Sequence, residues 1–209
     1  GQPMHAFDYA KLVTHNSKLT NIVVRRANDG EVFKTLDGGE YKLDERDLVI
    51  ANKEKAIALA GVMGGENSGI NENTKTIIFE SANFESVGVR RTALRLDLRS
   101  DSSARFEKSL DPNNCELALR RAVQLTLELC QGAKVVSNVA DESNFSLPTG
   151  PIELKLEFLW RKIGAELDKK AVNKILNSLG FVIKEKKEGL LVTVPTWRAT
   201  KDISIVEDL

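Results

Sequence analysis

The sequence predicts an α+β fold, in which a mixed sheet packed with helices is followed by a small second α+β domain. Short apolar, β-branched runs at 22–24 and 48–50 alternate with the turn signals Asp-Gly at 29–30 and Asp-Gly-Gly at 37–39. Residues 111–132 instead repeat apolar positions every three and four residues, which indicates an amphipathic helix. Strand patterns and a long helical pattern in one chain favour the α+β class.

Size and composition limit the kind of protein this can be. The chain has 209 residues, 42% of them hydrophobic, which is enough for one large or two small cores. Thirty basic residues balance thirty acidic ones, so an RNA contact would need local patches or other parts of an assembly. Apolar runs such as 76–79 are too short to span a bilayer, and no cleavable signal pattern opens the chain. We expect a soluble, cytoplasmic protein with neither a membrane nor a DNA partner.

Two further strands are expected in the first domain. Residues 56–62 form an apolar run that ends in a glycine-rich turn, and residues 76–81 alternate so that Glu80 lies at a strand end. The histidine outside any motif, His15, is expected at the surface.

The long helix has signals at both ends. Asp111 is expected as its N-cap, Pro112 suits the first helical position, and Gly132 suits the position just past the end. Its apolar stripe is expected to pack on the sheet and comprises Cys115, Ala118, Leu119, Ala122, Leu125 and Leu129.

The two cysteines lie within this helix. Fifteen residues at about 1.5 Å rise separate them by roughly 22 Å, whereas a disulfide needs Cα atoms within about 7 Å. Neither has a Cys or His neighbour at ligand spacing. We therefore expect Cys115 and Cys130 to be buried structural thiols, not a disulfide, a metal site or a nucleophile.

A composition shift indicates a domain boundary. Ser, Asn, Pro and Gly accumulate over 141–151, so we predict domains at 1–147 and 148–209. The second domain is small. Its expected elements are a strand at 152–156, helices at 158–163 and 169–179, and strands at 181–184 and 190–194, with a turn at Gly189 between the last two.

Several spaced motifs resemble one family. They are Gly1–Asp8, the turn Gly61–Gly69, the strand ending in Glu80, Arg90–Arg95, Ser100–Ser103 and Arg105–Pro112. Together they resemble the editing domain of the bacterial phenylalanyl-tRNA synthetase β subunit. The segment Pro195–Arg198 followed by Asp202–Leu209 resembles the fifth domain of that subunit. The resemblance implies an editing domain that begins before Gly1, with a pocket asparagine there, and a fifth domain that continues past Leu209.

The resemblance also implies an activity. The parent enzyme attaches phenylalanine to tRNA(Phe) using ATP in its α subunit, within an α2β2 assembly, and this chain would not bind ATP itself. The chain would hydrolyse mischarged tyrosyl-tRNA(Phe) by attack of water. The implied catalytic residues are His5, Glu80 and Ser100; the implied substrate-binding residues are Gly61, Gly64, Gly65, Glu80 and Ser102.

The chemistry of His5 and Glu80 also allows each of them a purely structural role. A lone histidine such as His5 is more often structural, although a neutral imidazole in a pocket can orient water. The general base stays open between His5 and the ribose hydroxyl of the substrate. Glu80 is costly to bury unpaired, so either Arg90 or Arg91 neutralises it or a ligand donates to it. The resemblance makes that donor the phenol of tyrosine; a site that hydrogen-bonds a hydroxyl discriminates by roughly 10⁴ to 10⁵.

The glycine turn and the serine motif carry further alternatives. The turn lacks the Lys-Ser/Thr ending of a phosphate loop, so its glycines indicate positive φ angles, close approach of a ligand, or both. Ser100–Ser103 stands where the family usually has Thr-Asp-Ala-Ser, and Asp97 where it commonly has glycine. A serine nucleophile is disfavoured, because the segment has neither a histidine nor a nucleophile-elbow pattern.

A basic run comprises Arg90, Arg91, Arg95, Arg99 and Arg105. It either contacts the 3′ end of the tRNA through phosphates or forms a solvated face with carboxylate partners.

The C-terminal acidic residues match a metal site. Asp202 and Asp208 correspond to ligands of a Mg²⁺ ion that the family shares with the α subunit, and oxygen ligands suit this cation. The two glutamates that complete that site would lie beyond Leu209. The alternative is that these residues cap a helix end.

Two other functions remain open at this point. One is a non-catalytic scaffold for assembly and tRNA binding, favoured by the departures at Ser102 and Asp97. The other is a free-standing editing protein, which should lack the segment 197–209.

Overall fold

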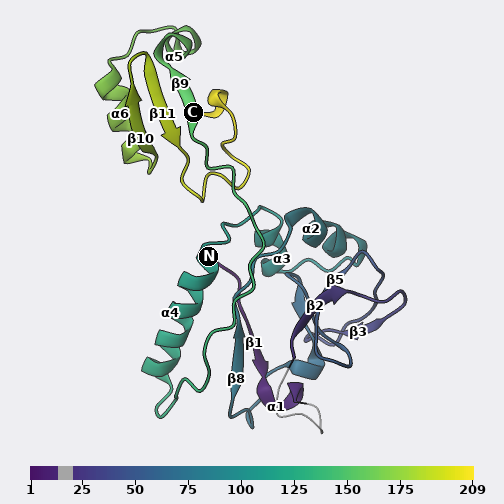
Figure 1. Ribbon diagram of the computed structural model, residues 1–209. Helices are drawn as coiled ribbons and strands as arrows, with labels where there is room; N and C mark the ends of the chain where they lie inside the picture. Colours follow the sequence, from purple (N-terminus) through teal and green to yellow (C-terminus); the bar gives the residue numbers. More distant parts are fainter. Residues whose placement is uncertain (14–20) are drawn as a thin grey trace. The chain divides into compact units, whose positions relative to one another are not determined.

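The computed structural model describes residues 1–13 and 21–209. The chain divides into two compact units, Gly1–Asn138 and Val139–Leu209 (Figure 1). Both combine helices with antiparallel sheets, so the predicted α+β class is confirmed. The division at 147/148 stays a prediction, and His15 lies outside the described residues.

The described residues of the first unit form three small sheets. Its strands are β1 (His5–Asp8), β2 (Val23–Arg26), β3 (Val32–Lys34), β4 (Glu40–Lys42), β5 (Leu48–Ala51), β6 (Ala56–Leu59), β7 (Met63–Gly64) and β8 (Ile77–Glu80). They pair as β1-β8, as β2-β5-β6-β7 and as β3-β4. Each of these ladders is antiparallel, so the mixed sheet expected from the sequence is wrong. The connections β3–β4, β5–β6 and β6–β7 are only a few residues long, whereas parallel pairing needs a crossover of about a dozen residues or more.

The two Asp-Gly sequences form two different kinds of turn. The turn at 37–39 closes the β3–β4 hairpin, with the Thr35 amide donating to the Gly39 carbonyl over 2.9 Å. The turn at 29–30 is also formed, but it connects β2 to β3, which belong to different sheets. It is therefore a turn between sheets rather than a hairpin.

The helices of the first unit follow capping chemistry. They are α1 (Tyr9–Leu12), the 3₁₀ helix η1 (Glu66–Ser68), α2 (Ser86–Arg95), α3 (Asp101–Phe106) and α4 (Asn114–Leu129). Glu85 caps α2 by accepting from the Val87 and Gly88 amides. Ser100 caps α3 in a capping box with Ser103.

Two apolar clusters hold this unit together. One lies among β3, β5, β6, α2 and α3 and contains Ala27, Phe33, Leu43, Val49, Ala56, Leu59, Val62, Val89, Leu98 and Phe106. The other lies between β1, α1 and β6 and contains Phe7, Leu12, Ile50, Ile57, Ala58 and Ala60. Strand β6 is buried at all four residues and serves both clusters.

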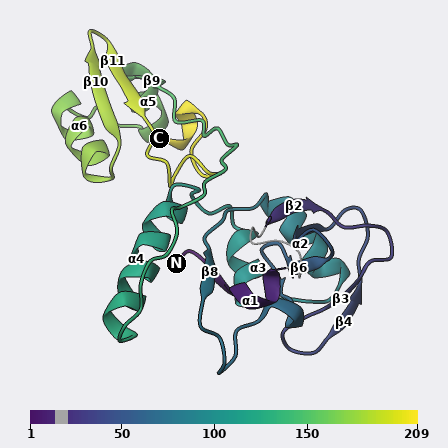
Figure 2. The same cartoon turned by 60° about the horizontal axis from the view of Figure 1, so that its bottom comes forward.

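Helix α4 departs from the expectation at both ends and on its apolar stripe. It begins at Asn114, because Asp111 accepts from the Asn113 amide and so caps a preceding turn instead of the helix. It ends before Cys130, whose backbone is extended. None of its residues is buried and Leu129 is 79% exposed, so the expected packing of the whole stripe on the sheet is wrong. Only part of the stripe, such as Leu119, is half-buried, where α4 lies beside β8 (Figures 1 and 2).

The environment of the two cysteines depends on helix α4. No disulfide joins Cys115 and Cys130, as expected. Cys115 is half-buried, but Cys130 is exposed, so the expectation of a buried thiol is wrong for Cys130. The reason is that the last turn of α4 is not covered.

Asp97 occupies a left-handed backbone position just after α2, with φ of 50°. The Leu98 amide donates back to the Ala93 carbonyl over 2.9 Å, which is the chain reversal that usually favours glycine. We expect Asp97→Gly to raise the free energy of unfolding by about 0.5–1 kcal/mol, since an L side chain is strained there. Urea denaturation measures this change.

Ser109→Gly is the matched control for Asp97→Gly. Ser109 also has a positive φ, of 62°, but its hydroxyl donates to Ser86 over 3.0 Å. The gain at Ser109 should therefore be smaller or absent. A loss of stability in Asp97→Gly would mean that the Asp97 side chain itself contributes to the fold.

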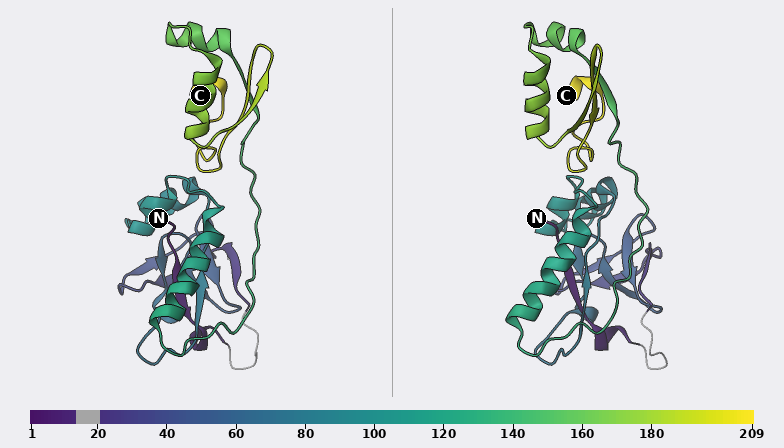
Figure 3. Two further views of the ribbon diagram at one scale, coloured as in Figure 1. Left: turned by 90° about the vertical axis from the view of Figure 1, so that its left-hand side faces the viewer. Right: turned by 60° about the vertical axis from the view of Figure 1, so that its left-hand side comes forward.

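The second unit is a three-stranded antiparallel sheet with helices. Its elements are β9 (Ile152–Lys155), α5 (Leu156–Ile163), α6 (Lys169–Ser178), β10 (Val182–Lys186), β11 (Gly189–Thr193) and the 3₁₀ helix η2 (Val206–Asp208). The strand order is β10-β11-β9, and α6 lies along one face of this sheet (Figure 3). Its core comprises Leu154, Val172, Leu176, Phe181, Leu190, Val192, Val194, Ala199 and Ile203.

The predicted elements of this unit are confirmed, apart from the turn. Gly189 pairs with Lys186 and with Lys155, so it belongs to β11. The turn itself is formed by Lys187 and Glu188.

Candidate functional site

Two candidates far apart in the sequence lie directly opposite each other. His5 begins β1, Glu80 ends β8, and the antiparallel register pairs these two residues. Side chains of directly opposed residues project from the same face of a sheet. The β1–β8 pair therefore presents an imidazole and a carboxyl group side by side.

These side chains line a cavity of about 240 Å³. Its walls are Pro3, Met4, His5, Leu36, Ile50, Ala58, Leu59, Gly61, Val62, Met63, Gly64, Glu80, Ser100, Asp101, Ser102 and Phe106. Six of the seven predicted catalytic and substrate-binding residues are among them. The exception is Gly65, which is buried beside the cavity and whose amide donates to the Ile57 carbonyl over 2.8 Å.

Sequence reasoning missed most of the apolar wall. Leu36 comes from the β3–β4 hairpin, Ile50 from β5 and Phe106 from the end of α3. Apolar residues in strands carry no signal that separates a pocket wall from a core. Asp101 was detectable in principle, because it lies inside the serine motif.

The Glu80 carboxyl group has no hydrogen-bond or ion-pair partner within the described part of the chain, although the residue itself pairs with His5 in the β1–β8 ladder. Arg90 and Arg91 lie on the exposed face of α2, so the alternative in which one of them neutralises Glu80 is wrong, and the alternative of a ligand donor stays a prediction. Burial raises the pKa of Glu80 to about 7. The carboxyl group is thus close to half protonated at neutral pH and open to a ligand donor.

His5 complements this carboxyl group. Its Nε2 atom is buried and has no hydrogen-bond partner among the described residues. Burial lowers the pKa of the imidazole below 6.5, so the ring is mainly neutral at pH 7. A neutral imidazole can hold a water molecule as donor or as acceptor.

Two glycines let the turn approach the site. A Cβ at Gly64 would lie 2.7 Å from His5 Nε2 and closer still to Cε1, so only glycine leaves room for the ring. Gly61 has φ of 72°, and a Cβ there would lie 2.9 Å from Val89 and 3.0 Å from Phe84. The positive φ expected of the turn is found at Gly61, and the close contact at Gly64 is made by the His5 ring. Close approach of a ligand to these glycines stays a prediction.

The two serines of the motif bond to the backbone of this turn. The Ser100 hydroxyl donates to the Val62 carbonyl over 2.6 Å, and the Ser102 hydroxyl donates to the Gly61 carbonyl over 3.1 Å. Ser100 also accepts from the Ser103 amide over 3.1 Å as the N-cap of α3. The extra hydroxyl at position 102 is thus satisfied within the wall.

The arginine run is only partly available to a ligand. Arg95 pairs with Asp44 and with the fully buried Asp47, and Arg99 pairs with Glu107 over 2.7 Å. The expectation of carboxylate partners is confirmed for these two arginines. The other three are exposed.

The C-terminal aspartates have partners within the chain. Asp202 is paired with Arg198, and Asp208 accepts from the Ser204 and Ile205 amides over 2.9 and 3.0 Å. Across residues 1–13 and 21–209, no three His, Cys, Asp or Glu side chains gather where they could hold a metal. Asp202 and Asp208 as ligands of a Mg²⁺ ion shared with another subunit stay a prediction, whereas the alternative of helix-end capping describes Asp208.

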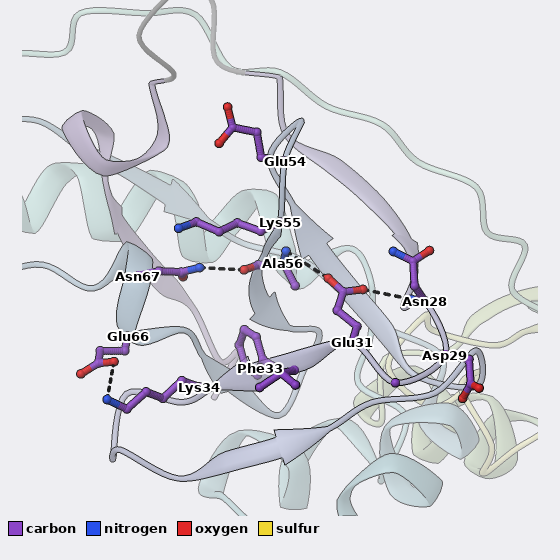
Figure 4. Close-up of a pocket in the computed structure, with 12 residues that line it drawn as sticks. Asn28, Asp29, Glu31, Phe33, Lys34, Glu54, Lys55, Ala56, Glu66 and Asn67 are labelled. Atoms are coloured by element: carbon purple, nitrogen blue, oxygen red, sulfur yellow. Dashed lines mark hydrogen bonds and ion pairs between the residues drawn. The ribbon is translucent and has the colours of Figure 1, made fainter.

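A larger cavity, of about 740 Å³, lies between β3 and the β5–β6 turn (Figure 4). Glu31 in its wall pairs with Arg25 over 2.8 Å and accepts from the Asn28 and Ala56 amides. Lys34 pairs with Glu66 over 2.9 Å. Glu31 and Lys34 thus each have a partner of opposite charge within the chain. Although this cavity is larger than the one beside His5 and Glu80, it is not the better candidate for the functional site.

The comparisons with known proteins agree with the motifs. Residues 1–131 match the family model of the B3/4 domain, and this match covers more than half of the chain. The chain belongs to the B3/4 domain family. Residues 152–209, after the B3/4 domain, match the tRNA synthetase B5 domain. Within the described residues, no helix has the length and apolar character needed to cross a bilayer.

The relatives carry one name. The chain is 47% identical to the phenylalanine–tRNA ligase beta subunit of Solibacter usitatus, 41% to that of Oceanobacillus iheyensis and 42% to that of Bacillus subtilis. Each match covers all of this chain, which spans about a quarter of the length of these relatives. The resemblance drawn from the motifs of the B3/4 and B5 domains is confirmed.

Among solved structures, the chain is similar to an N-terminal fragment of the phenylalanyl-tRNA synthetase beta subunit from Pyrococcus horikoshii. The TM-score is 0.47 at 15% identity, over 98% of this chain and 58% of the other.

Proposed function

We propose that this chain is the part of a phenylalanine–tRNA ligase β subunit that hydrolyses tyrosyl-tRNA(Phe). The observation that carries the proposal is the Glu80 carboxyl group beside the His5 Nε2 atom, neither of which has a partner among the described residues, in a cavity otherwise lined mainly by apolar side chains and glycine. Such a cavity suits an aromatic amino acid, and its two polar groups suit a phenol and a water molecule.

The chemistry is ester hydrolysis. Water attacks the carbonyl carbon of the tyrosyl ester, the bond to the ribose oxygen breaks, and the ribose oxygen takes up a proton, which releases tyrosine and intact tRNA. Glu80 accepts the hydrogen bond of the phenol, and neutral His5 orients the water. The base that removes the proton from water is either His5 or the ribose hydroxyl of the substrate. Ser100, the third residue that the sequence predicts to be catalytic, lines the same cavity.

The proposal also includes the other subunit of the enzyme. The α subunit uses ATP to attach phenylalanine to tRNA(Phe), in an α2β2 assembly in the cytoplasm. This chain binds neither ATP nor DNA in the proposal. Mg²⁺ belongs to the parent enzyme, and no step here passes through it.

The test is deacylation by the full-length enzyme that contains this chain. Purified tyrosyl-tRNA(Phe) and phenylalanyl-tRNA(Phe) are incubated with the enzyme, and loss of each ester is followed over time. We expect the tyrosyl ester to be cleared and the phenylalanyl ester to be spared. Clearance of neither ester would overturn the proposal and favour a scaffold for assembly and tRNA binding.

Gly64→Ala tests the position of His5 in this reaction. The added methyl group would displace the imidazole ring, and a misplacement of about 1 Å can cost roughly 100-fold in rate. We expect deacylation of the tyrosyl ester to fall by at least about tenfold. Gly38→Ala is the control, because it introduces a methyl group at a positive φ with no atom within 4 Å. Equal losses in both variants would contradict a role for the His5 position.

A further inference from the structure

The part of the cavity wall formed by Gly61 and Val62 is held by hydrogen bonds from one side. Gly61 and Val62 are consecutive in the turn, and their carbonyl oxygens accept hydrogen bonds from Ser102 and Ser100. Both donors lie in the first turn of α3 or just before it. Two adjacent peptide groups are therefore held by one short segment.

The same turn has little freedom on its other side. The Cα of Gly61 lies against Val89, Phe84 and Phe106, since a Cβ there would meet each of them within 3.2 Å. The Val62 amide donates to the Leu59 carbonyl over 3.0 Å. With the serine bonds in place, the dipeptide is fixed by packing behind it and by hydrogen bonds from α3.

Each serine has a single hydroxyl proton, and each donates that proton to the turn. Ser100 also uses an oxygen lone pair to accept from the Ser103 amide. Neither serine therefore has a proton left to donate to a substrate. Glu80 and His5, by contrast, have unfilled hydrogen-bonding capacity.

We infer that Ser100 and Ser102 are positioning residues: they hold the Gly61–Val62 carbonyls against α3 and so fix the wall along which the aminoacyl ester lies. This inference deepens the proposed function and rests on it. It assigns the serines to the placement of the ester, whereas Glu80 distinguishes tyrosine from phenylalanine.

The experiment compares Ser100→Ala/Ser102→Ala with wild type in the full-length enzyme. We measure kcat and KM for deacylation of tyrosyl-tRNA(Phe) and phenylalanyl-tRNA(Phe). The expected result is a fall in kcat of about tenfold for the tyrosyl ester, with KM changed less than about twofold, because position is lost without a binding contact. The preference for tyrosine should stay within about twofold of wild type.

Two further variants separate placement from stability. Ser103→Ala breaks the capping box from the other side and leaves both bonds to the turn intact. It should lower the Tm but leave kcat of the folded enzyme nearly unchanged. Ser100→Thr/Ser102→Ala keeps a hydroxyl group at position 100, so its kcat should lie above that of Ser100→Ala/Ser102→Ala. If the double alanine variant does not fold, the kcat of this variant is compared with that of wild type instead.

Each other outcome overturns the inference in its own way. A collapse of the preference in the double variant would make the serines contacts of the phenol. An unchanged kcat would mean that the turn holds its position without them, and an equal kcat loss in Ser103→Ala would reduce their role to capping α3. If wild type clears neither ester, the proposed function fails first and the inference fails with it.

Discussion

Glu80→Ala is expected to abolish the preference for tyrosyl-tRNA(Phe) over phenylalanyl-tRNA(Phe) in deacylation by the full-length enzyme. The carboxyl group lines the cavity and has no partner in residues 1–13 and 21–209, so it can accept a hydrogen bond from the phenol. Sites that bond a hydroxyl discriminate by roughly 10⁴ to 10⁵ against a ligand that lacks it. Alanine leaves an apolar wall, on which an extra hydroxyl is only weakly distinguished. We expect the ratio of the two rates to fall by at least about 100-fold.

The control is Asp101→Asn, which removes a carboxylate from the same cavity wall. Asp101 is exposed, so a water molecule can replace its contacts, and the preference should persist. A preference that survives in Glu80→Ala would move recognition of the phenol to other groups. A preference lost equally in both variants would indicate that the charge of the cavity, and not a contact to Glu80, sets the specificity.

Much of the site was predictable because its residues stand in local motifs. The placement of Glu80 at a strand end follows from the alternation over 76–81, and this placement is confirmed. The pairing of Glu80 with His5 could not be derived from periodicity, because the two residues are more than seventy positions apart in the sequence. Register between distant strands depends on the packing of the whole unit.

The errors in the fold have a common cause. Local signals place turns and helices well, but they do not say which elements meet. The stripe of α4 has the spacing of a buried face, yet Leu125 and Leu129 are exposed in this chain. Asp111 has the chemistry of an N-cap, but a competing turn takes its carboxylate. In the first case no described element covers this part of the stripe, and in the second a local turn competes with the helix cap.

The departures from the family pattern also needed the structure. Asp97 follows the end of α2 at a positive φ that this residue type tolerates better than most. The hydroxyl of Ser102 bonds to the Gly61 carbonyl, so it does not add an unsatisfied polar group to the wall. Neither departure therefore favours a vestigial pocket.

Glu80→Gln is expected to stabilise the protein at pH 8 and to change little below pH 4.5. The raised pKa of Glu80, about 7 against 4.5, means that the folded state keeps a proton that the unfolded chain has lost. Stability therefore falls as the pH rises from about 4.5 to about 7 and is level above that. At about 1.4 kcal/mol per pH unit, the penalty removed by glutamine is at most about 3 kcal/mol. Urea denaturation at pH 4.5 and pH 8 measures the difference.

Glu31→Gln provides a control of opposite sign within the same unit. The hydrogen bond from the Arg25 guanidinium lowers the pKa of Glu31 to about 2, so its carboxylate stabilises the fold above pH 4.5, and this contribution is lost as the pH falls toward 2. Glutamine at position 31 should therefore destabilise the protein at pH 8, where glutamine at position 80 stabilises it. If Glu80→Gln had no effect at pH 8, the carboxylate would have to be solvated in the cavity. It would then be ionised at neutral pH and would accept the phenol as a charged group. If Glu80→Gln is more stable than wild type at pH 8, the buried Glu80 carboxylate lowers the stability of the folded protein. Its presence would then serve binding of the ligand rather than stability.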